Sequence, residues 1–100
     1  TVKGVTLTAN GFYGPQGRVL RLPIEMPTVN DEIARFEFGN YKIVNYEMES
    51  AAIAGLAALM GHRATTICLI IANRANGDAS ADYKPHMKKL IEYTLNSLIR

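Results

Sequence analysis

Several features that would narrow the protein's role are scarce in its 100 residues. The single cysteine, Cys68, cannot form a disulfide within the chain, so a reducing, cytoplasmic location is expected. Eleven basic and nine acidic residues leave a net charge of only +2, and the basic residues are scattered, which argues against a nucleic-acid partner. The longest apolar run, from Ile67 to Ala72, is too short to cross a membrane.

Motifs for metal binding and for a nucleophile are also missing. His62 and His86 lack the spacing of a metal site and are expected at the surface. The lone cysteine adds no ligand cluster, so neither a metal nor another cofactor is expected. Ser50 and Ser80 lack the context of a nucleophile elbow. The sequence therefore offers no motif for metal chemistry or for a covalent serine mechanism.

What is present is a regular alternation of strand and helix patterns. The composition, 48% hydrophobic and 20% charged, is ordinary for a packed protein. Strand-like patterns cover residues 2–7, 19–24, 41–45 and 64–72, and helix patterns start near Thr28, cover 53–60 and follow Pro85. This order favours an α/β domain in which helices cover a largely parallel sheet, with no internal linker.

Two elements have the clearest signatures. The apolar residues of the middle helix recur every three or four positions and form one face, namely Ile53, Leu56, Ala57 and Met60. The segment from Ala64 to Ala72 is nearly all apolar and β-branched, which predicts a strand buried on both faces, with Cys68 in the core. The last helix has an apolar face as well, formed by Met87, Leu90, Ile91, Leu95 and Leu98.

A glycine-rich loop after the first strand gathers three different chemistries. Phe12 and Tyr13 offer a stacking face, Gln16 carries a donor and an acceptor, and Arg18 supplies a charged fork of donors. Together they could recognise a flat, polar ring such as uracil. The alternative interpretation is an ordinary glycine-rich turn with a solvated arginine.

Two carboxylates stand between a predicted strand and the start of the clearest helix. Glu47 and Glu49 can accept hydrogen bonds, which suits the hydroxyls of a sugar, and ligands of α/β sheets bind beyond the carboxyl ends of strands. Alternatively, the pair simply stabilises the helix N-terminus, with Met48 as core filler. Asn73 and Arg74 end the buried strand, where they either face a ligand or terminate the strand at the surface.

Taken together, these segments resemble the nucleoside phosphorylase superfamily, specifically the uridine phosphorylases. Phe12 to Arg18 is similar to the family's uracil-recognition loop, with Gly17 where a charged residue is often found. Asn45 to Ser50 is similar to its ribose-binding segment, and Ile70 to Arg74 to the strand end beside the base. The resemblance implies a three-layer α/β/α sandwich, of which residues 1–100 are the C-terminal part of a single domain. A start at Thr1 rather than a methionine also predicts a piece of a longer protein.

The resemblance assigns roles residue by residue. Glu49 accepts hydrogen bonds from the ribose hydroxyls, and Arg18 favours departure of uracil by binding a carbonyl; these two are the expected catalytic residues. The remaining expected substrate contacts lie around the base and sugar and comprise Phe12, Gln16, Glu47, Met48, Ile71, Ala72 and Arg74. Asn73 stands where the related purine enzymes carry an aspartic acid, so the resemblance favours a pyrimidine.

The implied activity is phosphorolysis, a pentosyl transfer in which inorganic phosphate converts uridine to uracil and ribose 1-phosphate. The family forms homo-oligomers, so a hexamer or dimer is expected. Its phosphate-binding residues lie mainly in an N-terminal part that has no counterpart here, so the isolated chain is expected to be inactive. A nucleoside hydrolase, a purine nucleoside phosphorylase and a non-catalytic nucleoside-binding domain remain the alternatives.

Overall fold

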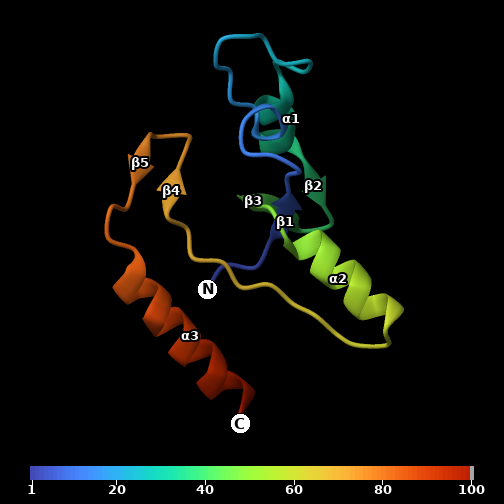
Figure 1. Cartoon of the computed structure of the whole chain (residues 1–100), viewed down its shortest axis with the longest axis vertical. Helices are drawn as coiled ribbons and strands as arrows, with labels where there is room; N and C mark the ends of the chain where they lie inside the picture. Colours follow the sequence, from blue (N-terminus) through green and yellow to red (C-terminus); the bar gives the residue numbers. More distant parts are fainter. Residues whose placement is uncertain (100) are drawn as a thin grey trace. The chain divides into compact units, whose positions relative to one another are not determined.

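The computed structural model describes residues 1–99 and has a mixed α/β fold (Figure 1). The chain divides into two compact units, one covering Thr1–Thr66 and the other starting at Ile67. The elements of the first unit are β1 (Val5–Thr8), the short 3₁₀ helix η1 (Gly14–Gln16), α1 (Val29–Arg35), β2 (Glu37–Phe38), β3 (Tyr41–Glu47) and α2 (Ser50–Leu59). Those of the second are β4 (Ala72–Asn73), β5 (Asp78–Ala79) and α3 (Lys84–Leu98).

The sheet of the first unit is organised around β3. Its strand order is β1-β3-β2, with β1 parallel and β2 antiparallel to β3. In the parallel pair Thr6 lies opposite Asn45 and Thr8 lies opposite Glu47. Because parallel strands end at the same edge of a sheet, the segments that follow β1 and β3 begin side by side.

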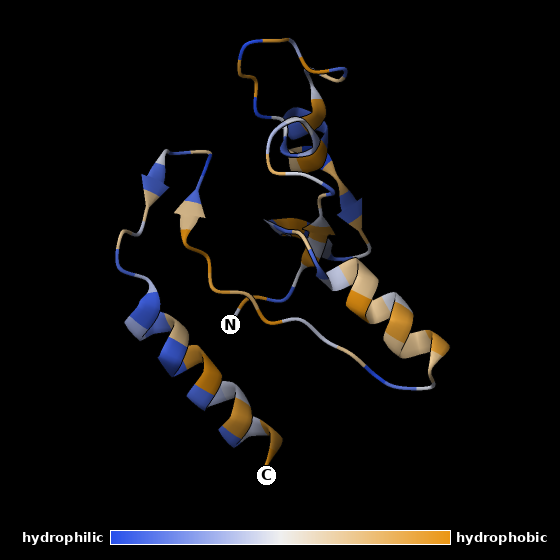
Figure 2. Cartoon of the chain, viewed as in Figure 1, coloured by the Kyte–Doolittle hydropathy of each residue, from blue (hydrophilic) through white to orange (hydrophobic). Residues whose placement is uncertain are grey.

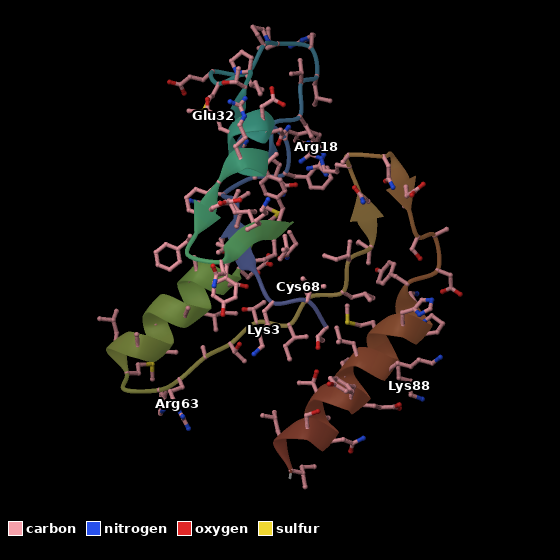
Figure 3. The ribbon with its side chains drawn as sticks, turned by 180° about the vertical axis from the view of Figure 1, so that it is seen from behind. Lys3, Arg18, Glu32, Arg63, Cys68 and Lys88 are labelled. Carbon is pink, nitrogen blue, oxygen red and sulfur yellow. The ribbon has the colours of Figure 1, made fainter. Side chains whose placement is uncertain are left out.

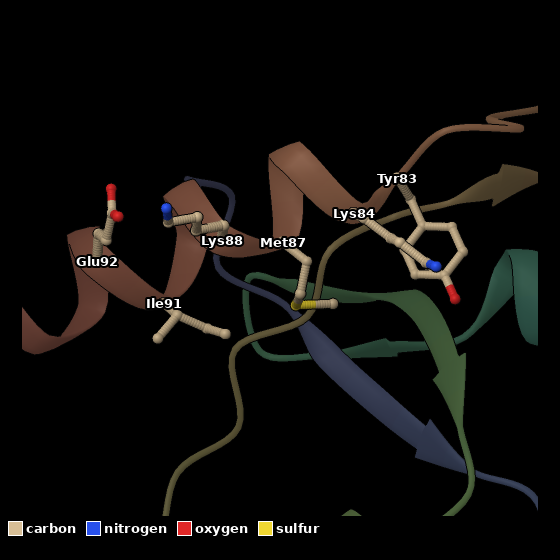
Figure 4. Close-up of a pocket in the computed structure, with 6 residues that line it drawn as sticks. All are labelled: Tyr83, Lys84, Met87, Lys88, Ile91 and Glu92. Carbon is tan, nitrogen blue, oxygen red and sulfur yellow. The ribbon is translucent and has the colours of Figure 1, made fainter.

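The two longer helices form where the sequence predicts helices. Helix α2 ends at Leu59, and Gly61 follows with a φ of 74°, a left-handed conformation that suits glycine at a helix end. Apolar residues surround most of α2, whereas α3 carries an apolar stripe beside a hydrophilic one (Figure 2). Met87 and Ile91 project from the same side of α3 and line a shallow hollow (Figure 4).

The strand expected over residues 64–72 is largely wrong. The structure has no strand from Ala64 to Ile71, and pairing begins only at Ala72, which lies opposite Ala79. Cys68 is half-buried rather than fully inside a core. The sequence supplies strand propensity, but a strand also needs a neighbour that completes its hydrogen-bond ladder.

The extended segment expected over residues 19–24 also forms no strand, and its backbone bends from Leu20 to Leu22 instead. Pro23 has no N–H to donate to a ladder, so it favours such an irregular path. His62 and His86 are exposed, as expected. Among residues 1–99, no helix is long and apolar enough to span a membrane.

Burial is concentrated at the beginning of the first unit. Among the described residues, only Ala9 and Gln16 are buried, each about 5% exposed. Ala9 comes directly after β1, and its N–H donates to the Glu47 carbonyl at 2.8 Å. Gln16 is a polar side chain, and a buried amide needs hydrogen-bond partners to offset its lost hydration. Gln16 is therefore sheltered within the loop after β1, whereas Phe12 and Tyr13 of the same loop remain exposed.

Candidate functional site

The Phe12–Arg18 loop leaves the carboxyl end of β1 and folds back on itself. The Tyr13 carbonyl accepts hydrogen bonds from the backbone N–H groups of Gln16 at 3.1 Å and Arg18 at 2.9 Å. Pro15 stands near the start of η1, where its missing N–H costs nothing. These local bonds place the side chains of Gln16 and Arg18 within one compact turn.

The guanidinium of Arg18 contacts the other two predicted substrate-binding side chains of this loop, Phe12 and Gln16. Its central carbon lies 3.7 Å from the centre of the Phe12 ring, which is a cation–π contact. Nη1 donates at 2.5 Å to both the Phe12 carbonyl and Gln16 Oε1. Tyr13 packs edge-on against Phe12, with 5.3 Å between ring centres. Figure 3 labels Arg18 on this loop. The structure thus brings Phe12, Gln16 and Arg18 together.

Gly17 allows α1 to approach the loop closely. Its φ of 67° lies in the left-handed region that other residues adopt only with strain. A Cβ at this position would lie 2.4 Å from Asn30 Nδ2 and 2.9 Å from Val29 Cγ1. A side chain here would therefore have to displace the start of α1.

Asn30 on α1 connects the loop to β3. Its Nδ2 donates to the Gly17 carbonyl at 3.4 Å, and its Oδ1 accepts a hydrogen bond from the Tyr46 hydroxyl at 2.9 Å. The Asn30 amide thus links the loop that follows β1 to Tyr46 on β3. Neither Asn30 nor the Tyr46 hydroxyl was predicted from the sequence.

Glu47 ends β3 with both carboxylate oxygens engaged by the protein. Oε1 accepts a hydrogen bond from the Thr8 hydroxyl, and Oε2 accepts from the backbone N–H groups of Glu49 at 2.7 Å and Ser50 at 2.6 Å. Desolvation acts to raise the pKa of Glu47, but the hydrogen bonds from Thr8, Glu49 and Ser50 outweigh it and lower the pKa from 4.5 to about 2. The carboxyl group of Glu47 is therefore ionised at neutral pH.

Thr8 is a second feature that sequence reasoning missed. Besides donating to Glu47, its hydroxyl oxygen accepts the N–H of Ala51 at 3.0 Å. Alternating threonines in β1 are visible in the sequence, but their partners depend on the register with β3, which the sequence does not reveal.

Met48 and Glu49 lie between β3 and α2 with exposed side chains. Glu49 is the N-cap of α2, and its side chain makes no capping hydrogen bond to the helix. Its backbone N–H, by contrast, is held by Glu47. The carboxylate of Glu49 therefore faces solvent while its backbone is fixed.

The remaining predicted residues, Ile71, Ala72 and Arg74, belong to the second unit. The Ile71 carbonyl accepts the N–H of Ser80 at 2.7 Å, next to the β4–β5 pairing. Asn73 Oδ1 accepts the N–H of Ala75 at 3.0 Å, so this amide shapes the turn that contains Arg74. All three predicted side chains are exposed and stand around this hairpin.

The first unit therefore gathers polar side chains where two parallel strands end, which is a common position for ligand sites in α/β sheets. Within residues 1–99, no cluster of three or more potential metal ligands exists. The phosphorylase superfamily model matches residues 1–98, and the chain belongs to that superfamily.

Three relatives are similar to most of the chain. Uridine phosphorylase A and the inactive uridine phosphorylase B of Schistosoma mansoni are each 38% identical over 78 residues, which cover 77% of this chain and 26% of theirs. The uridine phosphorylase of Thermococcus kodakarensis is 30% identical over 81 residues, or 75% of this chain and 26% of its own. This chain thus spans about a quarter of the length of these relatives. No solved structure matches it significantly.

Proposed function

We propose that the full-length protein is a uridine phosphorylase, which converts uridine and inorganic phosphate to uracil and ribose 1-phosphate. The observation that carries this proposal is the Phe12–Gln16–Arg18 cluster. It combines an aromatic face, a buried amide and a guanidinium held by two hydrogen bonds and a cation–π contact. Such a set matches a flat ring that presents an N–H between two carbonyl groups. The similarity of this chain to two proteins named uridine phosphorylase adds support.

The proposed reaction places charge where these residues can stabilise it. A phosphate oxygen attacks C1′ of the ribose, the C1′–N1 bond breaks, and its electron pair leaves with uracil. That negative charge spreads over the two carbonyl oxygens of the ring, and the guanidinium of Arg18 stabilises it through hydrogen bonds. Glu49 holds the ribose hydroxyls during the attack, and Met48 packs under the sugar. Positioning and electrostatics then provide the catalysis, without a cofactor.

Other parts of the full-length protein complete the site in this proposal. They supply the phosphate-binding residues and the rest of a three-layer α/β/α sandwich, and subunits assemble into a dimer or hexamer. On the second unit, Ile71, Ala72 and Arg74 are the further substrate contacts in this proposal. The isolated 100-residue chain is then inactive, and turnover of uridine and phosphate by this chain alone would contradict that part of the proposal.

The decisive experiment measures uracil release from uridine by the full-length protein, with and without phosphate. Release that requires phosphate, together with no release of hypoxanthine from inosine, is the expected result. Release without phosphate would instead identify a nucleoside hydrolase. Preference for inosine would identify a purine phosphorylase and overturn the assignment of Gln16 and Arg18.

A non-catalytic nucleoside-binding role is the second candidate. The chain is as similar to the inactive uridine phosphorylase B as to uridine phosphorylase A, with 38% identity to each. Similarity over this segment therefore does not separate the two. Calorimetric binding of uridine without any release of uracil in phosphate would identify this second role.

A further inference from the structure

We propose that Thr8 and Glu47 are positioning residues that hold the start of α2 and thereby set the place of Glu49. This inference rests on the proposed function, because Glu49 is the residue proposed to hold the ribose hydroxyls. It changes the role of Glu47 from a substrate contact to a support for the neighbouring carboxylate.

The first argument is the hydrogen bonding at the start of α2. The first N–H groups of a helix have no partner within the helix and must find one elsewhere. Here Glu47 accepts the N–H groups of Glu49 and Ser50, and Thr8 accepts that of Ala51. Two side chains from two parallel strands therefore satisfy three consecutive N–H groups.

The second argument is the bond between the two supports. The Thr8 hydroxyl has one hydrogen, which it donates to Glu47 Oε1, and its oxygen accepts from Ala51. Glu47 uses its other oxygen for the helix. The two side chains and the helix start thus form a closed network in which each group fixes the next.

The consequence concerns the carboxylate of Glu49. Its backbone is held by Glu47, whereas its side chain is exposed and makes no capping bond. Fixing the backbone while leaving the carboxylate available reduces the cost of ordering it when a sugar binds. Removing the Thr8 hydroxyl should loosen this arrangement without touching the substrate.

β1 itself provides a matched control. Thr6 lies two residues before Thr8 on the same face of the strand, and its hydroxyl donates to Asn45 Oδ1 at 3.0 Å. Thr6→Val thus removes a threonine hydroxyl that also bonds to β3, whereas the side-chain bonds to the start of α2 come from Thr8 and Glu47. A general effect of a lost hydroxyl would appear equally in both variants.

The experiment measures kcat/KM for uridine in the full-length protein. Thr8→Val should lower kcat/KM about tenfold, because a hydrogen bond to a charged group is lost. Thr8→Ser keeps the hydroxyl, so its kcat/KM should stay within about threefold of wild type. The control Thr6→Val should also stay within about threefold. In a Glu49→Gln background, Thr8→Val should lower kcat/KM little further, because both changes act through the same carboxylate. Equal losses in Thr6→Val and Thr8→Val, or additive losses with Glu49→Gln, would overturn the inference.

Amide hydrogen exchange keeps this test separate from the proposed function. Thr8→Val should speed exchange at Glu49, Ser50 and Ala51, whereas Thr6→Val should not. If the wild-type protein releases no uracil, the proposed function fails and this measurement alone decides the inference. Unchanged exchange at the three amides in Thr8→Val would then overturn it, and selective acceleration would support it.

Discussion

The hydroxyl of Tyr46 donates to Oδ1 of Asn30 at 2.9 Å, and the same amide donates to the Gly17 carbonyl at 3.4 Å. Tyr46 lies within the Asn45–Ser50 segment proposed to bind ribose, and Gly17 lies between the two polar residues proposed to bind uracil. Asn30 therefore couples the two halves of the site. Asn30 lies on α1, and the sequence of this helix alone does not predict that it links the two halves.

Substitution of Asn30 should weaken uridine binding rather than abolish turnover. Asn30→Ala removes both bonds of the bridge, but the bond to Gly17 is long at 3.4 Å, so the bond from Tyr46 dominates. A neutral hydrogen bond is worth about 1 kcal/mol, so KM for uridine should rise about fivefold. Tyr46→Phe should produce a similar rise. Tyr41→Phe is the control, because Tyr41 is an exposed tyrosine of the same strand, and it should leave KM for uridine unchanged. Steady-state kinetics with the four proteins would show whether the bridge matters.

Gly17 should tolerate no side chain. Gly17→Ala combines a left-handed φ with contacts of 2.4 and 2.9 Å to α1, so the free energy of unfolding should fall by about 1–3 kcal/mol. Gly14→Ala is the matched control, since a Cβ at Gly14 would meet nothing within 4 Å. Urea denaturation of both variants would test this, and equal midpoints would contradict the close approach of α1.

Arg18 should not be replaceable by lysine. Lysine keeps the charge but loses the planar fork and its stacking over Phe12, so Arg18→Lys should lower kcat/KM for uridine about a hundredfold. Arg21→Lys, at an exposed position of the following segment, should change it little. If lysine restored most of the activity at position 18, the guanidinium would serve only as a point charge.

The ionisation of Glu47 should contribute to stability at neutral and mildly acidic pH. Its pKa is lowered from 4.5 to about 2 in the folded protein, so its contribution is present above pH 4.5 and is lost as the pH falls from 4.5 to 2. Urea midpoints of wild type and Glu47→Gln should therefore differ most above pH 4.5 and converge towards pH 2. A difference that grows on acidification would show that the carboxylate is not stabilised by its hydrogen bonds.

The sequence predicts the elements that depend on local pattern. Apolar residues at helical spacing predict α2 correctly, and Gly61 marks its end. Gln16 and Arg18 are only two residues apart, so their proximity is also visible in advance. The segment from 64 to 71 shows the limit, because its composition favours a strand but a ladder requires a neighbour.

The sequence does not predict contacts that depend on register. Thr8 meets Glu47 only because β1 and β3 pair with those residues opposite each other. A shift of one residue would turn the Thr8 hydroxyl to the other face of the sheet. The family resemblance identified the Asn45–Ser50 segment, but the supporting role of Thr8 emerged only from the folded geometry.

Thr8 and Glu47 are 39 residues apart in the chain, whereas Arg18 and Gln16 are separated by two. Closing a long loop costs chain entropy before its contacts form. We therefore expect the Phe12–Gln16–Arg18 cluster to assemble early within its own turn, and the Asn45–Ser50 segment to become ordered only once β1 and β3 have paired. Slower strand pairing would then delay the appearance of the proposed activity during refolding without altering the proposed preference for uracil.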